Sequence, residues 1–169
     1  VIVATAQGLK MHGGTAVDKI KQEDMDGLQK GLENLRKHLD NLATFGQTVV
    51  VAFNQFPTDT EKEVRAVREF CEKSGIRFSV NEGFTKGGEG AIDLAKTVID
   101  VVENEPSKPL QFTYNDEDSI ETKLEKIALT IYGARDVVYG EKAMKMLKKI
   151  SGTELAKMPV CIAKTQYSF

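Results

Sequence analysis

The sequence predicts an α/β protein in which helices cover both faces of a parallel sheet, so that the core has three layers. The first observation is Val49–Phe53, an apolar, β-branched run without a polar break, which is typical of a central parallel strand. The second is that short apolar runs alternate with stretches of helical periodicity, which indicates strand–helix–strand crossovers. We expect an incomplete core in residues 1–105 and a helical excursion after residue 103. Residues 106–169 are then a linker, two helices and a terminal strand, which could begin a further subdomain.

The composition excludes several classes of partner. The chain has 169 residues, of which 41% are hydrophobic and 28% charged, and its formal net charge is −2. This balance gives no electrostatic reason to expect nucleic acid or an anionic membrane, and no apolar run approaches the ~20 residues that span a bilayer. Cys71 and Cys161 lie far apart without metal-type spacing, so we expect reduced thiols, a cytoplasmic location and no metal site. The sequence begins with a predicted strand, without Met, and stops without a closing element, so we expect a fragment of a longer protein.

The first part of the chain predicts a regular alternation of elements. Leucines and Met25 recur at steps of three and four up to Leu42, which indicates a long amphipathic helix that Gly46 ends. Thr58 or Asp59 could cap the helix that follows the central strand. In order, we expect strand 1–5, loop 6–14, helix 24–46, strand 48–53, helix 59–74, strand 76–80, loop 81–90 and helix 91–102.

The second part of the chain begins with a change in amino-acid composition. Residues 103–118 contain Pro106, Pro109 and many acidic and turn-forming residues, which favours a linker or surface excursion. Amphipathic periodicity then predicts two helices, and an apolar run near the end predicts a last strand. These elements are expected at residues 120–131, 142–150 and 158–163.

Four loops that follow apolar runs are the candidate site, namely 6–14, 54–59, 81–90 and 164–168. If the strands are parallel, these loops converge on the carboxyl edge of the sheet, where open α/β sheets bind ligands. This convergence predicts a ligand site without identifying the ligand.

Each candidate residue in the second loop has a structural and a functional interpretation. Asn54 and Asp59 could only hold the turn and cap the helix, or their polar groups could read the edge of a base or pterin. Phe56 could fill the core or could be a platform on which a planar ligand stacks.

The remaining loops leave the same choice open. Lys86, Gly87 and Gly88 lead into a helix, where exposed N–H groups favour either a tight turn or a bound anion. Neither G-x-x-x-x-G-K-[ST] nor G-x-G-x-x-G occurs in the chain. His12 could carry a proton or be structural, His38 is expected on the solvated surface, and residues 164–167 could reach the site.

Several strings resemble formate–tetrahydrofolate ligase, also called formyltetrahydrofolate synthetase. The resemblance covers the whole chain in order, and the combination of N-x-FPTDT with C-x-AKTQYS is specific. The matching strings are LKMHGG (9–14), VVVAFNQFPTDT (49–60), KGGEGAIDLA (86–95), IYGA (131–134) and PVCIAKTQYS (159–168).

The resemblance implies a folate site. In the family, two aromatic residues sandwich the folate ring, and they correspond to Phe56 and Phe84. The second is usually Trp in the family, and Phe offers less stacking area. Val80 falls near an apolar pocket residue of the family. The resemblance assigns no catalytic role to His12 or Lys164.

The resemblance also implies an activity for the longer protein. It would be an ATP-dependent ligase of one-carbon metabolism that formylates tetrahydrofolate with formate, through formyl phosphate, to 10-formyltetrahydrofolate. ATP, Mg²⁺ and a homo-oligomer are implied for that enzyme, with a P-loop-NTPase-like core whose phosphate loop lies in an N-terminal part. We expect this chain to be inactive alone, with its catalytic residues elsewhere. The alternative is a stand-alone nucleotide-binding module, in which Asn54 and Asp59 read a base and Gly87–Gly90 contacts phosphate.

Overall fold

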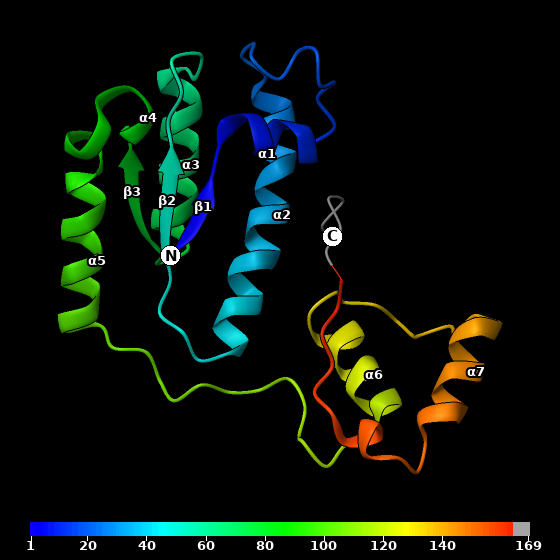
Figure 1. Ribbon diagram of the computed structural model, residues 1–169. Coiled ribbons are helices and arrows are strands. Elements are labelled where there is room, and N and C mark those ends of the chain that lie inside the picture. Colours follow the sequence, from blue (N-terminus) through cyan, green and yellow to red (C-terminus); the bar gives the residue numbers. More distant parts are fainter. Residues whose placement is uncertain (164–169) are drawn as a thin grey trace. The chain divides into compact units, whose positions relative to one another are not determined.

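The computed structural model describes residues 1–163 and has an α/β architecture around a three-stranded parallel sheet of order β1-β2-β3 (Figure 1). The register places Ile2 beside Val51 and Val51 beside Phe78. The predicted fold class and the parallel sheet are therefore confirmed. The strands are β1 (Ile2–Ala4), β2 (Val50–Asn54) and β3 (Arg77–Asn81).

The chain forms two compact units, Val1–Pro109 and Leu110–Phe169. The first contains the sheet, five α-helices and a 3₁₀-helix. These are α1 (Ala6–His12), α2 (Met25–Thr44), α3 (Glu61–Lys73), α4 (Gly83–Lys86), the 3₁₀-helix Gly87–Ala91 and α5 (Ile92–Asn104).

Helices cover both faces of the sheet. On one face, the leucine stripe of α2 and Val67 and Cys71 of α3 join Val51 and Phe53 in the main hydrophobic cluster. On the other face, Arg77 forms an ion pair with Asp100 of α5. Because side chains alternate along a strand, the burial of β2 on both faces explains its unbroken apolar sequence.

The segment 6–14, predicted to be a loop, is largely the helix α1. It packs so closely on α2 that a Cβ on Gly31 would lie 1.9 Å from the carbonyl oxygen of Leu9. A Cβ on Gly13 would lie 1.7 Å from the carbonyl oxygen of Gly27. The glycines therefore allow two helix backbones to approach each other, and this tertiary contact outweighs their weak helix propensity.

The cap of α3 also differs from the prediction. Thr60 is the N-cap, rather than Thr58 or Asp59, and it forms a capping box with Glu63. The reciprocal bonds satisfy two backbone N–H groups that a helix start leaves unpaired. The predicted loop 81–90 likewise contains α4 and most of the 3₁₀-helix.

The second unit contains α6 (Ile120–Thr130), α7 (Glu141–Ile150) and the 3₁₀-helix Glu154–Lys157. Lys123 is fully buried and donates to the carbonyl oxygens of Lys157 and Met158 at 3.2 and 3.3 Å. The strand predicted at 158–163 is wrong, because none of these residues pairs with a strand of the described sheet. Instead, the hydroxyl of Tyr114 accepts from the backbone N–H of Val160 at 3.0 Å.

No helix within residues 1–163 has the length and apolar character needed to cross a bilayer.

Candidate functional site

Three of the four predicted loops meet at one edge of the sheet. Because β1, β2 and β3 are parallel, the segments that follow them all leave from the carboxyl edge (Figure 1). Gln7, after β1, donates from Nε2 to Oγ1 of Thr58, after β2, at 3.3 Å. The expected convergence is confirmed for these loops, whereas residues 164–168 lie outside the described part of the chain.

The turn after β2 is held by hydrogen bonds around Phe56. The Phe56 N–H donates to Oδ2 of Asp59 at 2.9 Å, and the Asp59 N–H donates to the Phe56 carbonyl at 2.9 Å. Thr60 then begins α3. The turn therefore fixes the backbone from which the Phe56 ring projects, and Asp59 has a structural function.

Asp59 is held at an electrostatic cost. Its Oδ1 is buried and has no hydrogen-bond partner among the described residues. Desolvation by burial raises the pKa of this carboxyl, and the charge of Glu63 acts in the same direction, while the bond from Phe56 opposes both. The folded turn therefore disfavours the charged form of Asp59.

A buried ion pair stabilises the start of α3, directly after the turn. Nζ of Lys10 lies 2.6 Å from Oε1 of Glu63, and neither side chain is exposed. Lys10 also donates to the Gln22 carbonyl at 2.7 Å, while Oε2 of Glu63 accepts from the Thr60 N–H at 2.9 Å. The pair thus joins α1 to the helix start that follows Phe56.

Phe84 lies in the short helix α4 beyond β3. Gly87 ends this helix at φ +61°, a conformation that favours glycine. Gly90 packs against the preceding turn, because a Cβ there would lie 2.5 Å from the carbonyl carbon of Glu82. The Glu82 N–H donates to the Gly90 carbonyl at 3.0 Å, so the glycine-rich segment closes on itself.

The structure brings the two predicted aromatic residues together. The ring centroids of Phe56 and Phe84 are 5.1 Å apart, with an interplanar angle of 60°. This is an edge-to-face contact. A planar ring between them would need a separation of roughly 7 Å, which is twice the usual contact distance. Phe84 is 73% exposed, so its side chain has room to rotate away.

Val80 precedes Phe84 by four residues in the sequence. It lines a polar hollow whose lining includes neither Phe56 nor Phe84. The hollow has a volume of about 410 Å³ beside β3, and its lining includes Arg68, Lys86 and Asp93. Val80 is half-buried there, at the end of an edge strand of the described sheet.

The residues predicted to bind a nucleotide have partners within the chain. Oδ1 of Asn54 accepts from Nδ2 of Asn81 at 2.8 Å, and Nζ of Lys86 donates to Oε2 of Glu82 at 2.7 Å. Gly87 and Gly88 are exposed in the first turn of the 3₁₀-helix. Asp59 holds the turn after β2, Asn54 bonds across the ends of β2 and β3, and Lys86 pairs with Glu82 four residues before it, which supports a structural interpretation of each.

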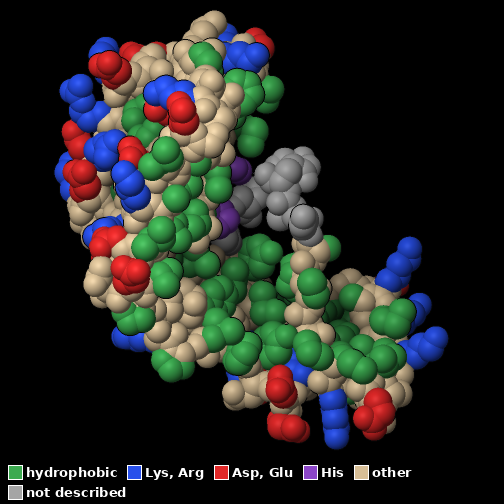
Figure 2. All heavy atoms as spheres, turned by 60° about the vertical axis from the view of Figure 1, so that its left-hand side comes forward, with side chains coloured by type: hydrophobic (Ala, Val, Ile, Leu, Met, Phe, Trp, Pro, Cys, Tyr) green, Lys and Arg blue, Asp and Glu red, His purple; other side chains and the backbone are tan. Residues whose placement is uncertain are grey.

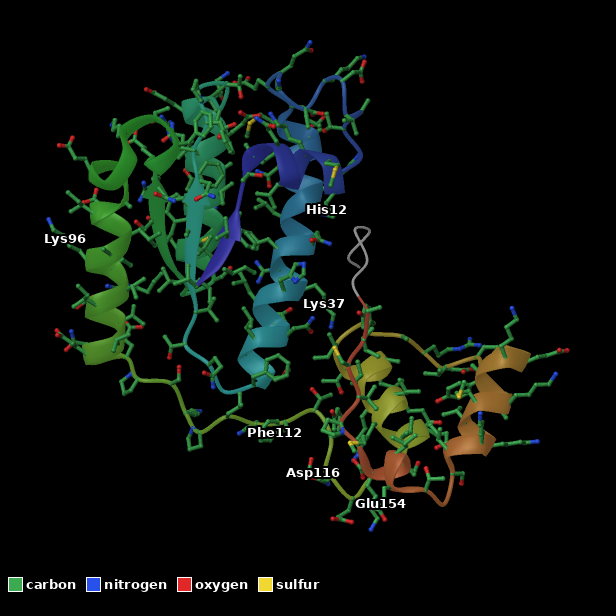
Figure 3. All side chains as sticks on the ribbon, in the orientation of Figure 1. His12, Lys37, Lys96, Phe112, Asp116 and Glu154 are labelled. Carbon is green, nitrogen blue, oxygen red and sulfur yellow. The ribbon has the colours of Figure 1, made fainter. Side chains whose placement is uncertain are left out.

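The histidines lie in another part of the first unit. His12 is exposed in the last turn of α1 (Figure 3), and histidine side chains are visible on the surface in Figure 2. They line a hollow of about 330 Å³ with β1. His38 is half-buried rather than fully solvated as expected, and burial lowers its pKa, followed by the effect of His12.

Within residues 1–163 no group of three or more His, Cys, Asp or Glu side chains is arranged to hold a metal ion.

Sequence reasoning missed three residues at this edge. Lys10 and Glu63 are far apart in sequence, and no local pattern predicts that they pair. The capping box was visible as Thr60-x-x-Glu63, a known signature. Asn81 follows the apolar core of β3 and carries the same amide chemistry as Asn54.

The fold and the loops after its strands define an α/β protein with an incomplete, P-loop-like parallel core. A family model described as formate–tetrahydrofolate ligase matches residues 1–169, and the chain belongs to that family.

Curated relatives agree with this assignment. The chain is 55% identical over 169 residues to the formate–tetrahydrofolate ligase of Bacteroides fragilis, 54% over 169 residues to that of Bacteroides thetaiotaomicron and 49% over 170 residues to that of Campylobacter concisus. The matches cover 100% of this chain and 30%, 30% and 31% of these relatives. The chain thus spans about a third of their length.

Proposed function

We propose that this chain is the tetrahydrofolate-binding portion of an ATP-dependent formate–tetrahydrofolate ligase. The complete enzyme would join formate to tetrahydrofolate through formyl phosphate and release 10-formyltetrahydrofolate. The observation that carries the proposal is the Phe56–Phe84 pair at the carboxyl edge, 5.1 Å between centroids, in a chain of this family.

The two rings suit a flat heterocycle. Aromatic faces stack on a pterin through dispersion and quadrupole interactions, and such pairs contribute about 0.5–1.5 kcal/mol beyond the area they bury. Phe56 lies on a braced turn, whereas the ring of Phe84 is largely exposed. We infer that Phe84 rotates to admit the pterin. Val80 lines the neighbouring polar hollow, and its contact with the ligand stays a prediction from the resemblance.

The proposed contribution of this chain to catalysis is positional. Formyl phosphate is reactive, so a site that orients the pterin amine toward the formyl carbon and excludes water accelerates the transfer. The aromatic pair would provide the orienting platform. Catalytic groups that touch formate or phosphate belong, in this proposal, to the remainder of the ligase.

ATP and Mg²⁺ are part of the proposal for the complete enzyme only. The chain has no phosphate-loop motif, and the described residues group no metal ligands. We therefore assign the triphosphate and its ion to an N-terminal part of the ligase. A homo-oligomer and a cytoplasmic location are further parts of the proposal, and the two free cysteines suit a reducing compartment.

A stand-alone nucleotide-binding module receives no support from a specific observation. Oδ1 of Asn54, Oδ2 of Asp59 and Nζ of Lys86 each form a bond within the chain. Calorimetry of this chain with ATP and with tetrahydrofolate separates the two functions, because the module predicts ATP binding without folate binding.

The decisive experiment is Phe56→Ala in the full-length ligase. We expect the KM for tetrahydrofolate to rise by about fivefold or more, since one stacking contact is lost. Phe112→Ala is the matched control, because Phe112 is 79% exposed and lies in the other unit (Figure 3). An unchanged folate affinity and KM in Phe56→Ala would remove the ring from the site.

A further inference from the structure

We propose that Asn81 is a positioning residue of the folate site, which fixes the spacing of the backbones that carry Phe56 and Phe84. The inference rests on the proposed function, because it concerns the same pair of rings. It adds a residue that does not touch the ligand and acts through the two loops.

Asn81 bonds to both loops at once. Its Nδ2 donates to Oδ1 of Asn54 at 2.8 Å, and its Oδ1 accepts from the N–H of Gly83 at 3.1 Å. Its carbonyl oxygen accepts from the N–H of Gln55 at 3.0 Å. One residue therefore joins the end of β2, the residue before Phe56 and the first residue of α4.

These bonds lie at the ends of β2 and β3, where they can hold the backbone that leads to the two rings. Asn54 and Asn81 are paired in register as the last residues of β2 and β3. The chain passes from them to Phe56 and Phe84 within a few residues. Strand ends fray more readily than strand centres because fewer bonds hold them, and the amide bridge counters this just before the rings.

The hydrogen bonds of the two loops limit how the rings of Phe56 and Phe84 can move apart. Each loop backbone is held from two sides, with Phe56 also bonded to Asp59 and Glu82 also bonded to Gly90. The additional room a pterin needs must therefore come from side-chain rotation of Phe84, which is 73% exposed. Asn81 sets the backbone spacing, and rotation of Phe84 opens the slot.

The test uses Asn81→Asp in the full-length ligase. A carboxylate at position 81 still accepts from the Gly83 N–H. It cannot donate to the side-chain Oδ1 of Asn54, and it repels that oxygen. We expect the KM for tetrahydrofolate to rise about tenfold, with kcat and the KM values for ATP and formate within about twofold. The increase should diminish as the pH falls toward about 4, because the protonated carboxyl regains a donor.

Two further variants keep the test independent of misfolding. Asn54→Ala removes only the acceptor, and we expect its effect to be less than additive with that of Asn81→Ala. Both variants break the Asn54–Asn81 bond, and Asn81→Ala also loses the bond from the Gly83 N–H. Asn104→Asp is the matched control, because Nδ2 of Asn104 donates to Oδ1 of Asp100 at 2.8 Å on the exposed side of α5. We expect that control to leave every KM unchanged.

The outcomes separate this inference from the proposed function. An unchanged folate KM in Asn81→Asp, with a raised KM in Phe56→Ala, overturns the inference and leaves the function. Unchanged values in both variants overturn the function as well. Additive effects of Asn54→Ala and Asn81→Ala also overturn the inference, because they mean that Asn81 does not act through Asn54.

Discussion

Lys10 and Glu63 form a fully buried ion pair, with Nζ and Oε1 2.6 Å apart. The pair connects α1, which follows β1, to the start of α3, which follows the Phe56 turn. Each partner has a second bond, to the carbonyl of Gln22 and to the N–H of Thr60. These bonds compensate in part for the loss of hydration that burial of two charges entails.

Lys10→Met should strongly destabilise the chain. It leaves the Glu63 carboxylate buried without its cation, which typically costs about 3–5 kcal/mol. The free energy of unfolding from urea denaturation measures the effect. The double variant Lys10→Met/Glu63→Gln should recover much of the loss, because the amide is neutral and still accepts from Thr60.

The surface pair Lys62–Glu23 is the control for this experiment. Its atoms are 3.4 Å apart and Lys62 is 72% exposed, so Lys62→Met should cost less than about 1 kcal/mol. Equal losses in Lys10→Met and Lys62→Met would contradict the importance of burial.

Gly31→Ala should also be destabilising, because its Cβ would lie 1.9 Å from the Leu9 carbonyl oxygen. The helices α1 and α2 would have to separate, at a cost of about 1–3 kcal/mol or more. Gly88→Ala is the control, since a Cβ there meets nothing within 4 Å. Thermal denaturation compares them, and a stable Gly31→Ala would mean that the close helix approach is not needed.

The helices α1 and α2 show which elements the sequence could predict and which it could not. The leucine periodicity of α2 and the apolar run of β2 predicted both elements, because burial dictates those patterns locally. The glycines near α1 predicted a loop, since close contact with α2 is a tertiary property. The apolar run 158–163 predicted a strand, whereas the structure assigns no strand to these residues.

The site was predictable to a similar extent. Parallel strands bring their carboxyl ends together, so the proximity of Phe56 and Phe84 follows from topology once the loops are located. The direct contact of the rings does not follow, because it depends on side-chain rotamers. The Lys10–Glu63 pair and the Asn81 bridge depend on packing between segments distant in sequence.

Asp59→Asn should alter the pH dependence of stability. Burial raises the pKa of Asp59 above its usual value of 3.8. Stability linked to its protonated form is complete below that value and is lost as the pH rises through the folded-state pKa. The variant has no such loss, so its advantage should grow from about pH 3 to about pH 7.

The expected gain is below about 1 kcal/mol, because the side chain is only partly buried and solvent screens it. Urea denaturation at several pH values measures it. A difference that is constant with pH, or that reverses, would contradict the raised pKa.

Phe84→Trp should strengthen folate binding in the full-length ligase. The indole adds stacking area, and the exposed position of Phe84 leaves room for it. We expect the KM for tetrahydrofolate to fall by about three- to tenfold. Phe112→Trp adds the same ring in the other unit, and an equal decrease there would argue against stacking at Phe84.

The chain has two thiols of opposite character. Burial raises the pKa of Cys71 to about 11, and its side chain is inaccessible, whereas Cys161 is exposed. Because thiolates are the reactive species, a maleimide should label the native chain at Cys161 alone. A fluorophore can therefore be attached at one known point without mutagenesis, and later reactivity of Cys71 would report that the hydrophobic interior has opened.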